Sequence, residues 1–195
     1  MFPRFLSLFK KRPPAEKPLP QLEMLREDMD DLPEIVIPPG YELRTYRPGD
    51  EAAWCDIMEG NVGRGWTVDR CRAKLTEDAR FQPESLFFVT HQGRPVASAC
   101  AWQKDLDDQT VGAVHMVAAL DAHRGKGLGH LVNAAVLHRL RDLGFRKAYL
   151  LTDDWRLPAI KSYLTAGFHP CHTHPSHPDR WQEIFKTLAL PEPKT

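Results

Sequence analysis

The sequence predicts a mixed α+β domain built on one β-sheet, and three features of the chain predict it. A β-prone run at residues 85–90, a Gln-Gly-Arg-Pro turn and a second run at 96–102 indicate a β-hairpin. A strand at 110–119 then leads through a glycine-rich loop into a helix that begins at residue 128. A further strand at 146–152 follows this helix, so a strand–loop–helix–strand unit lies at the centre of the domain.

The long central helix is predicted from the spacing of its apolar residues. Leu128, Val132, Val136 and Leu140 recur on one helical face, and Gly144 is expected to end the helix. Similar patterns predict strands at 41–46 and 181–188 and helices at 51–59, 68–75 and 158–166.

Length and composition indicate one globular domain with an extension. The 195 residues fit a single domain. Residues 1–39 are rich in proline and charge and are interpreted as an N-terminal extension with a short helix at 23–31, and residues 40–190 are interpreted as the domain. Lys plus Arg and Asp plus Glu number 26 each, which gives no electrostatic reason to expect nucleic acid as a partner.

The sequence favours a protein that is neither exported nor inserted in a membrane, and one without a metal site. No stretch approaches the roughly 18 apolar residues that span a bilayer, so no integral membrane association is expected. The four cysteines have no C-x-x-C spacing, and the expected location is the cytoplasm. Cys171, His174 and His177 could bind zinc, but they lie in a proline-interrupted stretch that is better interpreted as a polar loop. The oligomeric state stays open.

A loop with three glycines at residues 125–129 is suited to a phosphate group. The first turn of a helix presents free N–H groups and a positive dipole end. A nucleotide P-loop is excluded because Lys126 is followed by glycine and not by Ser or Thr. A dinucleotide fold would need glycine where His130 stands, although Asp153 could serve as its ribose-binding acid. A turn without a ligand is the other alternative.

Two motifs resemble those of a known enzyme family. Arg124-x-x-Gly127-x-Gly129 resembles the pyrophosphate loop of the GNAT superfamily of acyl-CoA N-acyltransferases. Residues 158–168, Pro-Ala-Ile-Lys-Ser-Tyr-Leu-Thr-Ala-Gly-Phe, resemble the later helix and turn of that family, and the resemblance covers about residues 40–190. It implies a sheet of six or seven mostly antiparallel strands, flanked by helices, whose central strand pair is splayed into a V.

The resemblance also implies acetyl-CoA as the acetyl-donor cosubstrate. Its pantetheine arm would pair with the strand before the loop, and the loop amides would hold its pyrophosphate. Arg156 stands where the family often has asparagine, and its guanidinium could reach a CoA phosphate, a substrate carboxylate or a neighbouring aspartate. The other implied cofactor-binding residues are Met116, Val117, Ala118, Ala119, Arg124, Gly125, Lys126, Gly127, Leu128, Gly129 and His130.

Two residues are implied as catalytic. Tyr163 matches the family's tyrosine that protonates the leaving CoA thiolate, and the alternative is a tyrosine packed in the core. His115 matches a histidine that some arylalkylamine-type members use as a base, and an ordinary pKa of about 6.5 suits that task. A purely structural histidine is the alternative interpretation.

The function implied is acetyl transfer to a primary amine of a small molecule, directly within a ternary complex. One alternative is a protein or peptide N-acetyltransferase, which predicts a wide, acid-lined groove near residues 54–66. The other is a non-catalytic acyl-CoA-binding module. Trp54 and Trp66 indicate an aromatic wall on the acceptor side.

Overall fold

The computed structural model describes residues 19–105 and 109–191 of the 195-residue chain. Its strands are β1 (Leu22–Arg26), β2 (Tyr41–Thr45), β3 (Leu86–His91), β4 (Arg94–Gln103), β5 (Val111–Ala119), β6 (Lys147–Thr152) and β7 (His169–Cys171). Its helices are α1 (Glu51–Met58), α2 (Val68–Cys71), α3 (Leu128–Asp142), α4 (Leu157–Thr165) and α5 (His177–Leu188), and a π-helical turn at Arg72–Thr76 extends α2.

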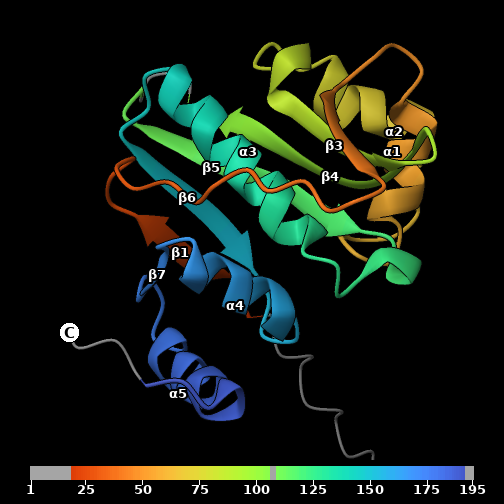
Figure 1. Ribbon diagram of the computed structural model, residues 1–195. Coiled ribbons are helices and arrows are strands. Elements are labelled where there is room, and N and C mark those ends of the chain that lie inside the picture. The colour runs from red at the N-terminus through yellow and green to blue at the C-terminus, as the bar shows by residue number, and fades with distance from the viewer. Residues whose placement is uncertain (1–18, 106–108, 192–195) are drawn as a thin grey trace, which may run out of the picture.

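The described strands form one seven-stranded sheet in the order β2-β3-β4-β5-β6-β1-β7 (Figure 1). Neighbouring strands run antiparallel, except β5 and β6, which are parallel. The predicted α+β fold with a mostly antiparallel sheet of six or seven strands is confirmed.

The central strand pair is splayed. β5 and β6 pair from Val111 opposite Lys147 to Ala113 opposite Tyr149. β5 nevertheless continues to Ala119 and β6 to Thr152. Beyond Ala113 the two strands therefore part, and the second half of β5 has no β6 residue beside it in the described sheet.

Helices cover both faces of the sheet, and each face has its own core. The buried side chains of α3, α4 and α5 form one core with β1, β4 and β6. On the opposite face, α1 and α2 pack over β3, β4 and β5, where Trp54 and Phe88 are fully buried (Figure 1). None of the helices in the described residues is long and apolar enough to cross a membrane.

The strand predicted at residues 181–188 is wrong, because this segment belongs to helix α5. Its β-prone aromatic residues are spaced as a helix face: Trp181, Ile184 and Phe185 are all buried against the core. Pro178, in the first turn, removes only an N–H that would have no intrahelical partner. The periodicity of 3.6 residues therefore outweighs local β-propensity.

The helix predicted at residues 23–31 is also wrong, because the segment begins as strand β1. Leu22 and Met24 are buried and alternate with less buried residues, and the strand lies between β6 and β7. Part of the predicted extension therefore completes the sheet and does not lie beside it. Residues 1–18 of that extension lie outside the described residues.

Arg26 anchors β1 to the end of α4. Its buried guanidinium donates to the carbonyl oxygens of Ala166 at 2.7 Å and Asp28 at 2.9 Å. The guanidinium lies directly over Gly167, where a Cβ atom would collide with it, and Gly167 has a left-handed backbone (φ 81°). Glycine is therefore required here twice, by conformation and by space.

Candidate active site

Strand β5 carries a bulge where it leaves β6. Met116 has a left-handed backbone (φ 56°), and the register of β4 against β5 shifts between Ser98 and Cys100. Two successive residues, His115 and Met116, consequently line the same pocket, whereas regular alternation would place them on opposite faces of the sheet. The bulge thus aims two side chains at the face covered by α1 and α2.

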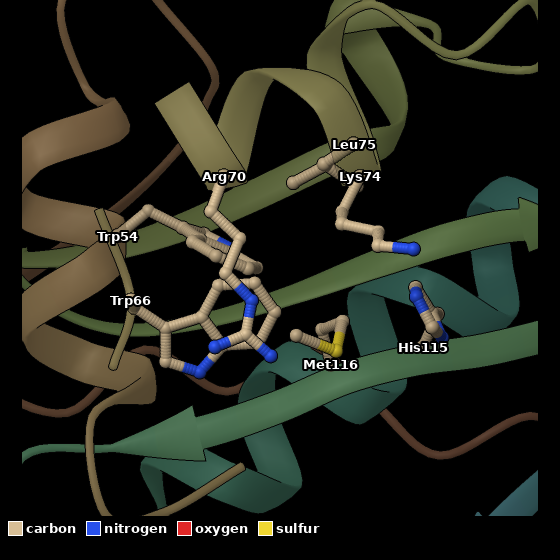
Figure 2. Close-up of a pocket in the computed structure, with 7 residues that line it drawn as sticks. All are labelled: Trp54, Trp66, Arg70, Lys74, Leu75, His115 and Met116. Atoms are coloured by element: carbon tan, nitrogen blue, oxygen red, sulfur yellow. The ribbon is translucent and has the colours of Figure 1, made fainter. Parts of the chain in front are cut away.

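The pocket on this face has a volume of about 190 Å³ (Figure 2). The rings of Trp54 and Trp66 meet edge to face with centroids 4.9 Å apart, and Trp66 Nε1 donates to the carbonyl of Val62 at 2.7 Å. The two tryptophans therefore form a fixed aromatic wall. The full lining is Trp54, Trp66, Arg70, Lys74, Leu75, His115 and Met116.

The glycine loop leads into α3 with its backbone N–H groups open. Gly127 is the N-cap residue in a left-handed conformation (φ 78°), and no side chain caps the first turn. A Cβ atom added to Gly125, Gly127 or Gly129 would meet no heavy atom within 4 Å. An anion can therefore approach the amides of this turn closely, as the pyrophosphate prediction requires.

The two cations of the loop have different surroundings. Arg124 donates to the Asp121 carboxylate at 2.8 Å and to Asn61 Oδ1 at 2.6 Å, which ties the loop to the turn that follows α1. Lys126 Nζ lies 5.7 Å from the ring centroid of Tyr41 and forms no ion pair within the described residues. Lys126 is therefore better placed than Arg124 to meet a phosphate.

Tyr163 and His115, the two residues implied as catalytic, lie on opposite faces of the splayed pair. Tyr163 projects from α4 into the core of the α3–α5 face and is 2% exposed, with the Phe168 ring 6.1 Å away. Burial raises the pKa of Tyr163, and the nearby Arg156 cation opposes that rise. The phenol is therefore protonated at neutral pH.

Arg156 spans the gap between the parted strands. Its Nη2 donates to the carbonyl oxygen of Val117 at 2.7 Å, so the side chain reaches from the start of α4 to β5. Its guanidinium also lies 5.8 Å from the Trp155 ring centroid. The three partners considered from the sequence did not include this backbone carbonyl, which sequence alone does not reveal because it depends on the strand gap.

His115 lies in surroundings that favour the neutral imidazole. Its ring centroid is 5.5 Å from that of Trp102. Burial lowers the pKa of His115 to about 4, with a smaller contribution from the Arg80 cation that Asp78 partly offsets. The prediction of His115 as a base relied on an ordinary pKa of about 6.5, and the folded protein does not retain that value.

The loop after β7 is held by contacts within itself. His177 is buried, and its Nδ1 lies 3.1 Å from the Cys171 carbonyl, while His174 Nδ1 lies 2.9 Å from Ser176 Oγ. Within residues 19–105 and 109–191, no group of three or more His, Cys, Asp and Glu side chains is arranged to hold a metal ion.

Two pocket residues, Arg70 and Lys74, escaped the sequence analysis. They are four residues apart, so a helical wheel over the predicted helix 68–75 places both on one side. Two surface cations on a short helix nevertheless resemble an ordinary solvated face. Only the position of β5 below α2 shows that they border a pocket.

Comparison with known proteins agrees with this geometry. Residues 51–168 match the model of the Acetyltransferase (GNAT) family. The mycothiol acetyltransferase of Thermomonospora curvata is 34% identical over 154 residues, which are 75% of this chain and 50% of that protein. The chain thus spans about half the length of the curated relatives it matches.

Solved structures share the fold. The GCN5-related N-acetyltransferase of Sphaerobacter thermophilus aligns with a TM-score of 0.64 at 24% identity, over 79% of this chain and 50% of that chain. Rv2747 of Mycobacterium tuberculosis, solved in complex with CoA and NLQ, aligns with a TM-score of 0.54 at 17% identity, over 74% of this chain and 81% of that chain. The sheet with its parted central strands, the open glycine loop and the family match together show that this chain belongs to the GNAT acetyltransferase family.

Proposed function

We propose that the chain is an N-acetyltransferase that moves the acetyl group of acetyl-CoA to a primary amine of a small molecule. The observation that carries this proposal is the pocket of about 190 Å³ beside the strand gap, on the face opposite Tyr163. The open amides of the glycine loop would hold the pyrophosphate. The backbone of β5 from Met116 to Ala119 would pair with the pantetheine arm, which would bring the thioester to the gap.

The chemistry is direct transfer in a ternary complex. The neutral amine nitrogen attacks the thioester carbonyl, a C–N bond forms, the C–S bond breaks, and the CoA sulfur leaves as a thiolate. Tyr163, protonated because burial raises its pKa, gives its proton to that sulfur. His115 is neutral at pH 7 and can accept the proton that the amine loses, although its low basicity makes it a weak base.

Arg156 has a supporting role in this proposal. Its bond to the Val117 carbonyl occupies the β5 backbone that the pantetheine arm would use. When the cosubstrate enters, the guanidinium must release this carbonyl, and a CoA phosphate is then a suitable new partner for it.

Two features favour a small-molecule acceptor over a protein. A protein N-acetyltransferase was expected to show a wide, acid-lined groove near residues 54–66, but the pocket there is small and has no Asp or Glu among its lining residues. The curated relatives are named for mycothiol, a small molecule, and not for a protein acceptor.

Ligand-dependent thermal unfolding and release of free CoA thiol test this function. Acetyl-CoA at 100 times its Kd should stabilise the fold by about 2.7 kcal/mol, which raises Tm by roughly 5–10 °C, whereas NAD and ATP should not. Tyr163→Phe should lower kcat about 100-fold with little change in Tm, because only the acidic hydroxyl is lost. The matched control Tyr46→Phe, in a half-buried tyrosine outside the site, should change kcat less than about threefold.

Stabilisation by NAD instead of acetyl-CoA would show that the glycine loop binds a dinucleotide, and it would overturn the proposal. Stabilisation by acetyl-CoA, with no thiol release for any amine, would indicate the non-catalytic acyl-CoA-binding module.

A further inference from the structure

The pocket lined by Trp54, Trp66, Arg70, Lys74, Leu75, His115 and Met116 is the proposed acceptor pocket. The charges around it are unusual for a site that must receive an amine. Two cations, Arg70 and Lys74, border it, and no carboxylate is among its lining residues. An amine in water is mostly a cationic ammonium, which two nearby cations repel. An acceptor made only of an amine and apolar groups would therefore be disfavoured here.

The two cations are also available to a ligand. Lys74 is exposed and forms no hydrogen bond or ion pair within the described residues. Figure 2 shows its amino group and the His115 ring projecting into the same side of the pocket from opposite walls. No protein carboxylate in the described part of the chain neutralises this lysine.

Arg70 is held in place by its own neighbours. Its Nη1 donates to the carbonyl oxygens of Arg64 at 2.6 Å and Gly65 at 3.2 Å. Its guanidinium carbon lies 4.2 Å from the Trp66 ring centroid, a stacking distance. These contacts fix the guanidinium at the pocket rim without pairing its charge, so an arriving anion meets a pre-oriented donor.

The other nearby charges cancel one another. Arg80 and Asp78, which act on His115, form a salt bridge of 2.7 Å. Glu59 accepts the backbone N–H groups of Gly65 and Trp66 and is not part of the lining. Arg70 is among the cations that lower the pKa of the Glu59 carboxyl, so its charge is partly offset, and the uncompensated charge at the pocket is that of Lys74.

We propose that the acceptor is an amine that carries a carboxylate, of the size of a single amino acid, and that Lys74 binds the carboxylate. The volume of about 190 Å³ accommodates a molecule of this size, and the wall of Trp54 and Trp66 suits an apolar side group. The amino group is then directed toward the bulge at His115 and Met116, where β5 parts from β6.

This arrangement also assists the chemistry. The substrate carboxylate offsets the repulsion that binding would otherwise meet, while the remaining positive field favours loss of the ammonium proton. The acceptor is thus turned into a nucleophile even though His115 is a weak base. The inference rests on the proposed function and specifies its substrate class.

The test is thiol release from acetyl-CoA by the purified chain with each of the twenty amino acids. Every amino acid that turns over is compared with its amide and with its decarboxylated amine, and O-phosphoethanolamine is compared with ethanolamine. The carboxylate member of each triplet should have a kcat/KM at least about tenfold higher, the range of a charge-assisted hydrogen bond. O-Phosphoethanolamine should gain less than the carboxylates.

Lys74→Met should raise KM for the amino acid about 5- to 20-fold and change KM for its amide less than about twofold, because the variant keeps the aliphatic stem and loses only the charge. Lys74→Arg, which keeps the positive charge, should have a KM for the amino acid close to that of the wild-type protein. The matched control, Lys186→Met on the exposed face of α5, should change neither value.

Three results would overturn the inference: equal kcat/KM for amides and amino acids, a preference for the phosphate over every carboxylate, or no amino acid turning over while other amines release thiol from acetyl-CoA. Failure of the proposed function looks different, since no amine of any kind would then release thiol.

Discussion

His115 shows how one side chain responds to the place that the strand bulge gives it. The folded protein lowers the pKa of this imidazole to about 4, whereas the unfolded chain leaves it at its ordinary value. When pH falls below about 6.5, the unfolded state takes up a proton that the folded state does not bind. Stability contributed by the neutral ring is therefore present above this range and is lost as pH falls toward 4.

His115→Gln should remove this pH dependence. Between pH 7 and pH 5 the wild-type protein should lose about 2 kcal/mol of unfolding free energy that the variant retains, an order-of-magnitude figure from the linkage relation. Urea unfolding of both proteins at pH 5, 6 and 7 measures the difference directly. Parallel stability curves would show that the histidine is not buried in its neutral form.

Two glycines near the site, Gly112 and Gly129, differ in what surrounds them, so substituting each one tests packing and ligand access separately. Gly112 in β5 lies under α3, where an added Cβ atom would collide with the side chain of Leu140 and lie 3.1 Å from Phe145. Gly129 lies in the first turn of α3, and a Cβ atom there would meet nothing within 4 Å. Packing in the fold accounts for Gly112, whereas no packing contact accounts for Gly129, and we expect that its role is to leave space for the pyrophosphate.

Gly112→Ala should destabilise the protein by about 1–3 kcal/mol through overpacking and should leave KM for acetyl-CoA unchanged. Gly129→Ala should leave stability equal or slightly higher, because alanine favours a helix, but should raise KM for acetyl-CoA severalfold. Chemical unfolding and steady-state kinetics on both variants separate the two effects. If Gly129→Ala left KM unaltered, the loop would not be the pyrophosphate site.

A helix or strand could be predicted from the sequence when the residues that determine it lie close together in the chain. The α3 helix and its glycine loop were predicted because apolar spacing and the loop glycines lie within one stretch of chain. β1 was missed because Glu23 and Arg26 resemble a charged surface helix, and only pairing with β6 buries Leu22 and Met24.

The same distinction holds for the candidate site. The motif residues of the loop and of α4 could be identified from the sequence, and their roles stay predictions. The Met116 bulge, the bond from Arg156 to Val117 and the low pKa of His115 depend on tertiary contacts, so no local pattern could reveal them.

The whole molecule depends on an N-terminal strand that the sequence assigned to an extension. β1 lies between β6 and β7, and Arg26 joins it to the end of α4, which carries Tyr163. Removing this strand would expose both of its neighbours. The sheet beside α4, which carries Tyr163, is therefore continuous only when the first described strand is present.

Met24→Ala should cost about 2–5 kcal/mol of unfolding free energy, because its side chain is fully buried. Leu19→Ala, three residues before the strand and 61% exposed, should change stability by less than about 0.5 kcal/mol. A chain begun at residue 40 should lose the cooperative thermal transition, since the lost burial and strand pairing approach the whole stability of a typical domain. A cooperative transition in that shortened chain would show that β1 is dispensable.

The position of β1 in the sheet also means that the strand made first is among the last to find its partner. The ribosome makes this strand before every other described strand, yet its partner β6 follows only after most of the domain has emerged. The apolar segment that forms β1 therefore stays unpaired while the chain is being synthesised. Strand β7 can join the sheet only once β1 has paired with β6.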